Sequence, residues 1–303
     1  MEQPAIAVDG LTKYYGPVVG VESLTFRVER GEIYGFLGAN GAGKTTTMRL
    51  LLDLLRPSGG RASILGADCH RDSRRTRALV GYLPGELPTY PDLSARGYLD
   101  YLAQIDGRPV SPAYLAELFA RFDVSALDLR RRLRDQSHGM KQKIGIIQAL
   151  MAEPPVLILD EPTAGLDPLM VQAFRDTLHA LKSRGTTTVL LSSHVLAEVE
   201  STCDRIGLVR GGRMVAIETI EALRRRAARV VTVEFSADVS AEVPVLAGVA
   251  LRDRTPRRWT LEVAAPLGPL LQAIAPLPVH DVQIEPFRLE DFIAGFYGVD
   301  VSS

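Results

Sequence analysis

A glycine-rich run near the start of the chain has the residue types and spacing of a phosphate-binding loop. Gly38–Thr45 matches the pattern of a glycine, four residues, and then glycine, lysine and threonine. Its glycines let backbone N–H groups surround phosphate oxygens, and the dipole of a following helix adds positive charge there. We therefore expect Lys44 to contact the β- and γ-phosphates of a nucleotide, Thr45 to ligate Mg²⁺ and Thr46 to bind the α-phosphate. The residues predicted to bind the nucleotide here are Gly38, Asn40, Gly41, Ala42, Gly43, Lys44, Thr45 and Thr46.

Two carboxylates follow an apolar run later in the chain. Val156–Leu159 has the composition of a buried strand, and Asp160 and Glu161 stand directly after it. Sheets of α/β proteins place ligand chemistry at the carboxyl ends of their strands. We expect Asp160 to hold Mg²⁺ and Glu161 to act on an attacking water, either as a general base or by positioning it. The alternative is a pair of acidic residues that cap the following helix.

A histidine follows the next predicted strand. His194 comes after Ser192 and Ser193, so its imidazole is expected at the same edge of the sheet, within reach of the γ-phosphate. The alternative for a histidine in this place is a purely structural role. Glu161, His194 and Lys44 are the residues that we predict to take part in catalysis.

Taken together, these motifs resemble those of the ATP-binding subunits of ABC transporters, over about residues 5–220. Gln136–Gln142, with the sequence QSHGMKQ, is similar to the signature of that family. Ala164–Asp167 resembles its D-loop, His194 its switch histidine, and Tyr15 the aromatic residue that stacks on adenine. The resemblance therefore implies an ATPase that uses ATP and Mg²⁺.

The resemblance also implies that the catalytic unit is a homodimer. Two chains would pack head to tail, so that the signature and Asp167 of each close on the ATP bound by the other. A serine at the signature can cap a helix whose N-terminus faces a phosphate, and a glycine permits close approach. The signature residues expected to act on the partner's ATP are Ser137, His138, Gly139 and Met140.

The chain departs from the family pattern at one loop in particular. Gly85 stands where the family usually has a glutamine that contacts Mg²⁺ and the attacking water. Glu86 could replace it, although its carboxylate would add negative charge beside the phosphates; otherwise the loop is only a coupling surface. In the signature, Gln136, His138 and Met140 also replace the usual residues. These changes predict slow turnover.

The elements that must position these residues follow from hydrophobic periodicity. The patterns predict an α/β fold with a parallel sheet and a mostly helical block between about Ser94 and Leu150. The resemblance implies that this is the P-loop NTPase fold of ABC type, a mixed-sheet core with a helical lobe at about residues 90–150. The predicted strands are Ala5–Val8, Leu24–Val28, Ile33–Leu37, Val156–Leu159 and Thr188–Leu191, with a hairpin of Arg205–Arg210 and Arg213–Ile217. Helices are predicted from Lys44 to about Leu55 and over Leu169–Lys182.

The pattern of predicted helices and strands changes near Thr219, which predicts a second, smaller domain. We expect an ATPase domain over residues 1–218 and an accessory α+β domain over residues 219–303. The second domain should hold a short helix that ends in Arg224–Arg226, strands at Val230–Phe235 and Trp259–Val263, and a helix at Leu289–Tyr297.

Composition excludes several classes of protein. With 46% hydrophobic and 23% charged residues the chain is neither disordered nor collagen-like. A formal charge of -1 gives no reason to expect nucleic acid as a partner. Its longest apolar stretch, Val243–Leu251, is far shorter than the roughly 20 residues of a membrane span. Since the start also lacks the pattern of a secretory signal, we expect the chain in the cytoplasm. The resemblance implies a peripheral place on the cytoplasmic side of the membrane.

The resemblance implies a subunit that powers export through a separate polytopic transmembrane permease. The Gly-Met-Lys-Gln form of the signature and the tail Leu289–Ile293 are similar to those of the exporter and drug-efflux branch. One alternative is a soluble ABC ATPase of translation or DNA repair, against which the single cassette and the lack of a long coiled coil argue. Another is an ATP-switched binding module, prompted by Gly85, against which Glu161 and His194 argue.

Overall fold

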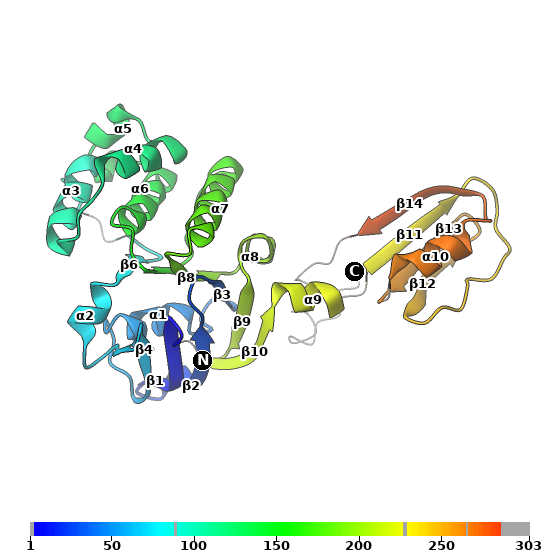
Figure 1. Cartoon of the computed structure of the whole chain (residues 1–303), viewed down its shortest axis with the longest axis horizontal. Coiled ribbons are helices and arrows are strands. Elements are labelled where there is room, and N and C mark those ends of the chain that lie inside the picture. The colour runs from blue at the N-terminus through cyan, green and yellow to red at the C-terminus, as the bar shows by residue number, and fades with distance from the viewer. Residues whose placement is uncertain (1–2, 88–89, 227–228, 265, 286–303) are drawn as a thin grey trace. The chain divides into compact units, whose positions relative to one another are not determined.

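The computed structural model describes residues 3–87, 90–226, 229–264 and 266–285 (Figure 1). The chain divides into two compact units, one that ends at Thr219 and one that begins at Ile220. The helix predicted at Leu289–Tyr297 lies outside the described residues.

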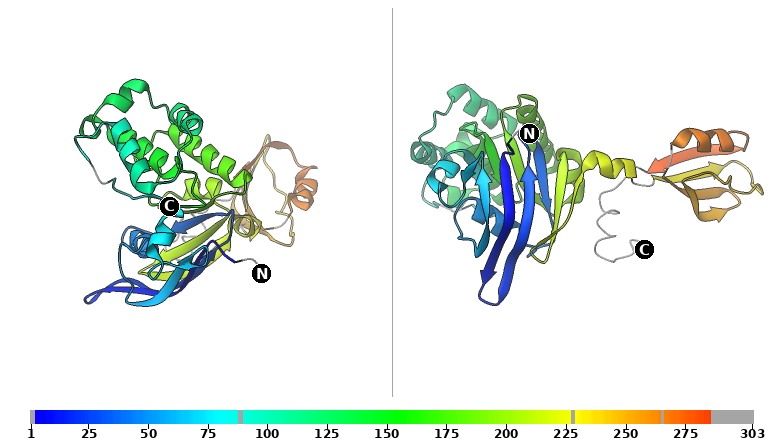
Figure 2. Two further views of the ribbon diagram at one scale, coloured as in Figure 1. Left: turned by 60° about the vertical axis from the view of Figure 1, so that its left-hand side comes forward. Right: turned by 60° about the horizontal axis from the view of Figure 1, so that its bottom comes forward.

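The first unit contains an antiparallel sheet with the strand order β2-β1-β4-β5. Its two long strands form a hairpin that Figure 2 shows clearly, and both exceed the strands predicted at Ala5–Val8 and Leu24–Val28. Gly16 has a φ of 59° at the turn, so the chain reverses tightly and the pairing continues to Tyr15 and Val18. The strands are β1 (Ile6–Tyr15), β2 (Val18–Val28), β4 (Gly59–Ile64) and β5 (Ala67–Asp68).

The second sheet of this unit has the order β10-β9-β3-β8-β7-β6, and the pairs among β9, β3, β8, β7 and β6 are parallel. Strand β10 alone is antiparallel to its neighbour, so the sheet is mixed, as the sequence predicts. Its strands are β3 (Ile33–Leu37), β6 (Val80–Leu83), β7 (Val156–Leu159), β8 (Thr188–Ser193), β9 (Arg205–Arg210) and β10 (Arg213–Thr219).

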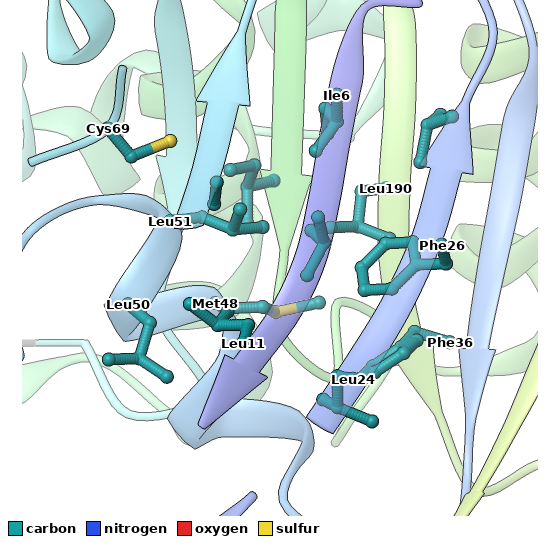
Figure 3. Packing of buried hydrophobic residues seen from close by; sticks show 14 of the residues in the cluster. Ile6, Leu11, Leu24, Phe26, Phe36, Met48, Leu50, Leu51, Cys69 and Leu190 are labelled. Atoms are coloured by element: carbon teal, nitrogen blue, oxygen red, sulfur yellow. The ribbon is translucent and has the colours of Figure 1, made fainter. Parts of the chain in front are cut away.

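The main hydrophobic core lies between these two sheets and includes helix α1 (Lys44–Leu51). Figure 3 shows Met48 and Leu51 of α1 packed among side chains of both sheets. Both side chains are fully buried. The prediction that this helix extends to about Leu55 is wrong, because Asp53 adopts a φ of 54°, outside the helical region. The core thus fixes the helix whose first residue closes the glycine-rich loop.

The helices between residues 95 and 150 gather in one lobe (Figure 1), and the last of them also packs on β6 of the six-stranded sheet. Serine side chains cap the N-termini of all four, which explains where each begins. They are α3 (Ala95–Asp106), α4 (Pro112–Arg121), α5 (Ala126–Arg130) and α6 (His138–Leu150), with a 3₁₀ turn at Leu133–Asp135. The remaining helices of the unit are α2 (Ser73–Arg77), α7 (Pro168–Ser183) and α8 (Leu196–Thr202).

The second unit is a four-stranded antiparallel sheet with the order β12-β13-β11-β14, preceded by α9 (Ile220–Arg226). Trp259 is fully buried and packs edge-on against Phe235. The predicted strands are present as β11 (Arg229–Phe235) and β13 (Arg258–Val263). The sequence prediction missed β12 (Val249–Thr255), β14 (Val279–Glu285) and α10 (Leu267–Ile274). The two missed strands are edge strands with mostly exposed residues, so they lack a clear alternating pattern.

Candidate active site

Three neighbouring parallel strands end at the same edge of the six-stranded sheet. In the register of the sheet, Leu37 at the end of β3 faces Ser193 of β8, and Leu159 at the end of β7 faces Leu191 of β8. The glycine-rich loop, the two carboxylates and the histidine therefore leave the sheet side by side.

The glycine-rich loop has a shape that excludes side chains at two positions. A Cβ atom on Gly38 would overlap the carbonyl oxygen of Val209, and one on Gly43 would lie 2.7 Å from that of Gly20. Gly43 also has a φ of 105° at the start of α1. Within this loop Lys44 is 6% exposed, and its Nζ donates a hydrogen bond of 2.6 Å to the carbonyl of Gly38. The other predicted loop residues are the exposed Asn40 and Gly41, the buried Ala42, and the half-buried Thr45 and Thr46.

Asp160 is the buried anion of the site. Its side chain is 1% exposed, and its Oδ2 accepts a hydrogen bond of 2.7 Å from the hydroxyl of Thr45. Its Oδ1 accepts a second one, of 2.6 Å, from the hydroxyl of Ser192. Sequence reasoning missed the part of Ser192, although its place at the end of a buried strand was a usable signal. A hydroxyl and a carboxylate that converge in this way are hard oxygen donors, the kind that Mg²⁺ prefers, so these residues fit the ion.

Glu161 brings the two other predicted catalytic residues together. Its Oε2 lies 2.7 Å from Nδ1 of His194, and its Oε1 lies 3.3 Å from Nζ of Lys44. Its backbone has a φ of 49°, a left-handed conformation that is costly for a residue other than glycine. The hydrogen bond from its backbone N–H to the hydroxyl of Ser192, of 2.9 Å, helps to hold this conformation. The carboxylate is therefore fixed between a lysine and a histidine.

Gly85 lies directly beside this cluster. A Cβ atom built on it would be 3.4 Å from Oδ2 of Asp160, an ordinary contact, and its φ is not left-handed. A longer side chain at this position would therefore start beside the carboxylate of Asp160. The neighbouring Glu86 is exposed, and its substitution for a glutamine stays a prediction.

The signature-like segment packs against the loop that follows Glu161. Ser137 caps α6, since its hydroxyl accepts a hydrogen bond of 3.2 Å from the N–H of Met140. A Cβ atom on Gly139 would lie 2.8 Å from the carbonyl oxygen of Gly165, and one on Gly165 would overlap the ring of His138. The start of α6 and the D-loop-like segment therefore touch within one chain.

Asp167 and Gln142 lie near this contact and make hydrogen bonds of their own. Asp167 is exposed and caps α7 by accepting a hydrogen bond of 3.0 Å from the N–H of Met170. Gln142 of α6 is buried and donates a hydrogen bond of 2.8 Å to the carbonyl of Pro162. Sequence analysis placed Gln142 in the signature-like motif but did not predict this contact, because nothing in a local pattern indicates a partner 20 residues further along the chain.

Gly20 lies between Tyr15 and the glycine-rich loop. A Cβ atom on Gly20 would lie 2.7 Å from the ring of Tyr15, and the carbonyl of the same Gly20 faces Gly43. The ring is 44% exposed, and Nζ of Lys13 lies 5.4 Å from its centre. Tyr15 is thus a partly exposed aromatic residue beside the loop, with the ammonium of Lys13 near its ring.

The contact between His138 and Gly165 leads to a stability prediction. We expect Gly165→Ala to lower the free energy of unfolding by up to about 1 kcal/mol more than Gly185→Ala, because an added methyl group must displace the exposed ring of His138. Both glycines have a left-handed φ, 76° and 68°, but only Gly185 has open space around it, so it controls for backbone strain. Urea unfolding curves of both variants measure the difference.

Removal of the histidine ring should reverse the effect. We expect His138→Ala, made together with Gly165→Ala, to restore most of the stability that Gly165→Ala loses beyond the control, because alanine removes the ring without adding a glycine to the helix. Equal losses for Gly165→Ala and Gly185→Ala would show that the ring does not press on this loop.

Comparison with known proteins agrees with this geometry. Residues 21–164 match the family model for the ABC transporter. The bacitracin transport ATP-binding protein BcrA of Bacillus licheniformis is 36% identical over 73% of this chain and 72% of its own length. The daunorubicin resistance ATP-binding protein DrrA3 of Streptomyces coeruleorubidus is 38% identical over 74% of this chain and 71% of its own.

The solved structures show the same likeness. The structure of an ATP-binding subunit of an ABC transporter superposes with a TM-score of 0.66 and 33% identity, over 73% of this chain and 92% of its own. The family match includes both the glycine-rich loop and the strand that carries Asp160 and Glu161. The chain therefore belongs to the ABC transporter family as one of its ATPases, which confirms the resemblance of its motifs.

Proposed function

We propose that this chain binds and hydrolyses ATP, and that hydrolysis powers export of a compound through a separate transmembrane subunit. The observation that carries the proposal is that Lys44, Asp160 and Glu161 meet at one sheet edge. Lys44 and Glu161 form an ion pair, and the hydroxyl of Ser192 binds both the carboxylate of Asp160 and the backbone N–H of Glu161. Thr45 also binds the carboxylate of Asp160. The family membership supports ATP as the nucleotide.

The phosphates of ATP would lie in the glycine-rich loop. Backbone N–H groups between Gly38 and Thr46 would surround them, and Lys44 would turn from the carbonyl of Gly38 to the β- and γ-phosphates. Thr45 and Asp160 would hold Mg²⁺, which when bound neutralises charge on the phosphate oxygens. Tyr15 would stack on the adenine.

Glu161 would act as the general base. One of its carboxylate oxygens accepts the proton of a water as that water forms a bond to the γ-phosphorus and the bond to the β-phosphate oxygen breaks. His194, which holds the other oxygen at 2.7 Å, would fix the direction of the carboxylate and contact the γ-phosphate. ADP and phosphate are the products.

The signature would act on the ATP of a second copy. Ser137, His138 and Asp167 are exposed, so they are available to a partner chain. The capped N-terminus of α6 offers backbone N–H groups and a positive dipole to a phosphate. A head-to-tail homodimer would then complete two sites, each with Gly139 and Met140 of the opposite chain.

The membrane path would belong to another protein. Among the residues that the structure describes, no helix has the length and apolar character that a bilayer crossing needs. The relatives named above concern bacitracin transport and daunorubicin resistance, which supports a subunit of the exporter branch. The chain would lie on the cytoplasmic side of the membrane, attached through a polytopic permease.

Replacement of the proposed base tests the catalytic assignment. We expect Glu161→Gln to lower kcat for ATP hydrolysis at least roughly 100-fold, because the amide cannot accept the proton. Binding of ATP should persist, since the glycine-rich loop is unaltered. The control is Glu117→Gln, which changes a partly exposed residue that pairs with Arg121 in α4. Unchanged turnover by Glu161→Gln would remove Glu161 from the role of base.

A second prediction concerns Gly85, which stands where the family usually has a glutamine. We expect Gly85→Gln to raise kcat up to roughly tenfold, equivalent to about 1.4 kcal/mol, and to tighten Mg²⁺ binding, because its amide would start beside Asp160. Gly85→Ala adds the Cβ atom without the amide and should change neither quantity much. If Gly85→Gln also leaves rate and Mg²⁺ affinity unchanged, the glycine is not the cause of slow turnover.

A further inference from the structure

A hydrogen bond connects the segment after the proposed base with the helix after the switch histidine. The hydroxyl of Thr163 donates to Oε2 of Glu198 at 2.5 Å. Thr163 stands two residues beyond Glu161, on the way to Asp167. Glu198 belongs to α8, which starts at Leu196, just after His194. The bond thus joins two segments that each carry a residue of the site.

The bond lies near the N-terminus of α8 and beside a pocket. Val195, the N-cap residue of α8, makes no capping hydrogen bond with its side chain. A cavity of about 140 Å³ lies between α8, α7 and β8, and both Thr163 and Glu198 line it. The bond thus lies at the edge of this pocket, where it links α8 to the segment that follows Glu161.

The same bond supports a strained segment. Glu161, with its φ of 49°, needs its surroundings to hold it in place. Ser192 binds its backbone N–H and His194 its carboxylate, but both lie at the end of β8 or just after it. The bond from Thr163 to Glu198 is a further connection between the chain segment of Glu161 and that of His194.

We propose that Glu198 is a positioning residue that couples His194 to the loop of Glu161 and Asp167. Through Thr163, movement of α8 with the switch histidine shifts the loop that faces the partner's ATP, so both respond together to the γ-phosphate. The proposal rests on the proposed function, because it assigns Glu198 a part in the same reaction. In this proposal Glu198 acts through Thr163 and not by direct contact with ATP or the attacking water.

A double-mutant cycle on the full-length chain tests this role. We expect Glu198→Ala and Thr163→Val each to lower kcat for ATP hydrolysis roughly 10-fold, because small displacements of a catalytic group are costly. KM should stay within about twofold, since the glycine-rich loop is unaltered. The double variant should be no slower than the slower single one, because both substitutions remove the same bond.

Conservative variants separate positioning from general stability. Glu198→Gln keeps an acceptor oxygen and Thr163→Ser keeps the hydroxyl, so both should retain at least about half of the wild-type kcat. Glu117→Ala, on the exposed face of α4, is the control for loss of a glutamate. Thermal unfolding of every variant shows whether a lower rate reflects loss of folded protein.

Three outcomes would overturn the inference. These are a normal kcat in Glu198→Ala, additive losses in the double variant, or a loss of rate that only follows a loss of folded protein. The wild-type rate distinguishes this failure from that of the proposed function. A wild-type chain without ATPase activity contradicts the proposed function, whereas an active wild type with an equally active Glu198→Ala contradicts only the coupling.

Discussion

The buried carboxylate of Asp160 is the constraint on which the arrangement of the site depends. A charge that is 1% exposed is costly unless hydrogen bonds compensate it, and the hydroxyls of Thr45 and Ser192 do so. Thr45 belongs to α1 and Ser192 to β8, while Asp160 follows β7. One carboxylate thus fixes the relative positions of three elements, and with them the phosphate loop, the base and the histidine.

A strained residue follows directly after this fixed point. Glu161 has a left-handed backbone, and Ser192, which binds Asp160, also binds its N–H. The strain directs its carboxylate to Lys44 and His194. Beyond it the chain turns toward Gly165, which packs under the first turn of α6. Glu161, proposed to act on the ATP of its own chain, and Asp167, proposed to act on that of a second copy, are therefore parts of one continuous segment.

Local patterns predicted the elements of the site well, because Gly38–Thr45 and the strand before Asp160 have strong, short-range signals. They failed where a distant contact or a backbone angle decides the outcome. The end of α1 depends on Asp53, and the full length of the first hairpin on Gly16. The contact of Thr163 with Glu198 joins residues far apart in the sequence, so no local pattern indicated it.

The most direct test of the account asks which protein this chain works with. The Glu161→Gln chain, tagged and loaded with ATP, would be captured from membranes in mild detergent, and its companions identified by mass spectrometry. Slow hydrolysis should prolong the closed dimer, so we predict recovery of a polytopic membrane protein that is lost without ATP or in a Lys44→Ala control. Recovery of ribosomes, DNA or the chain alone would contradict a role in transport.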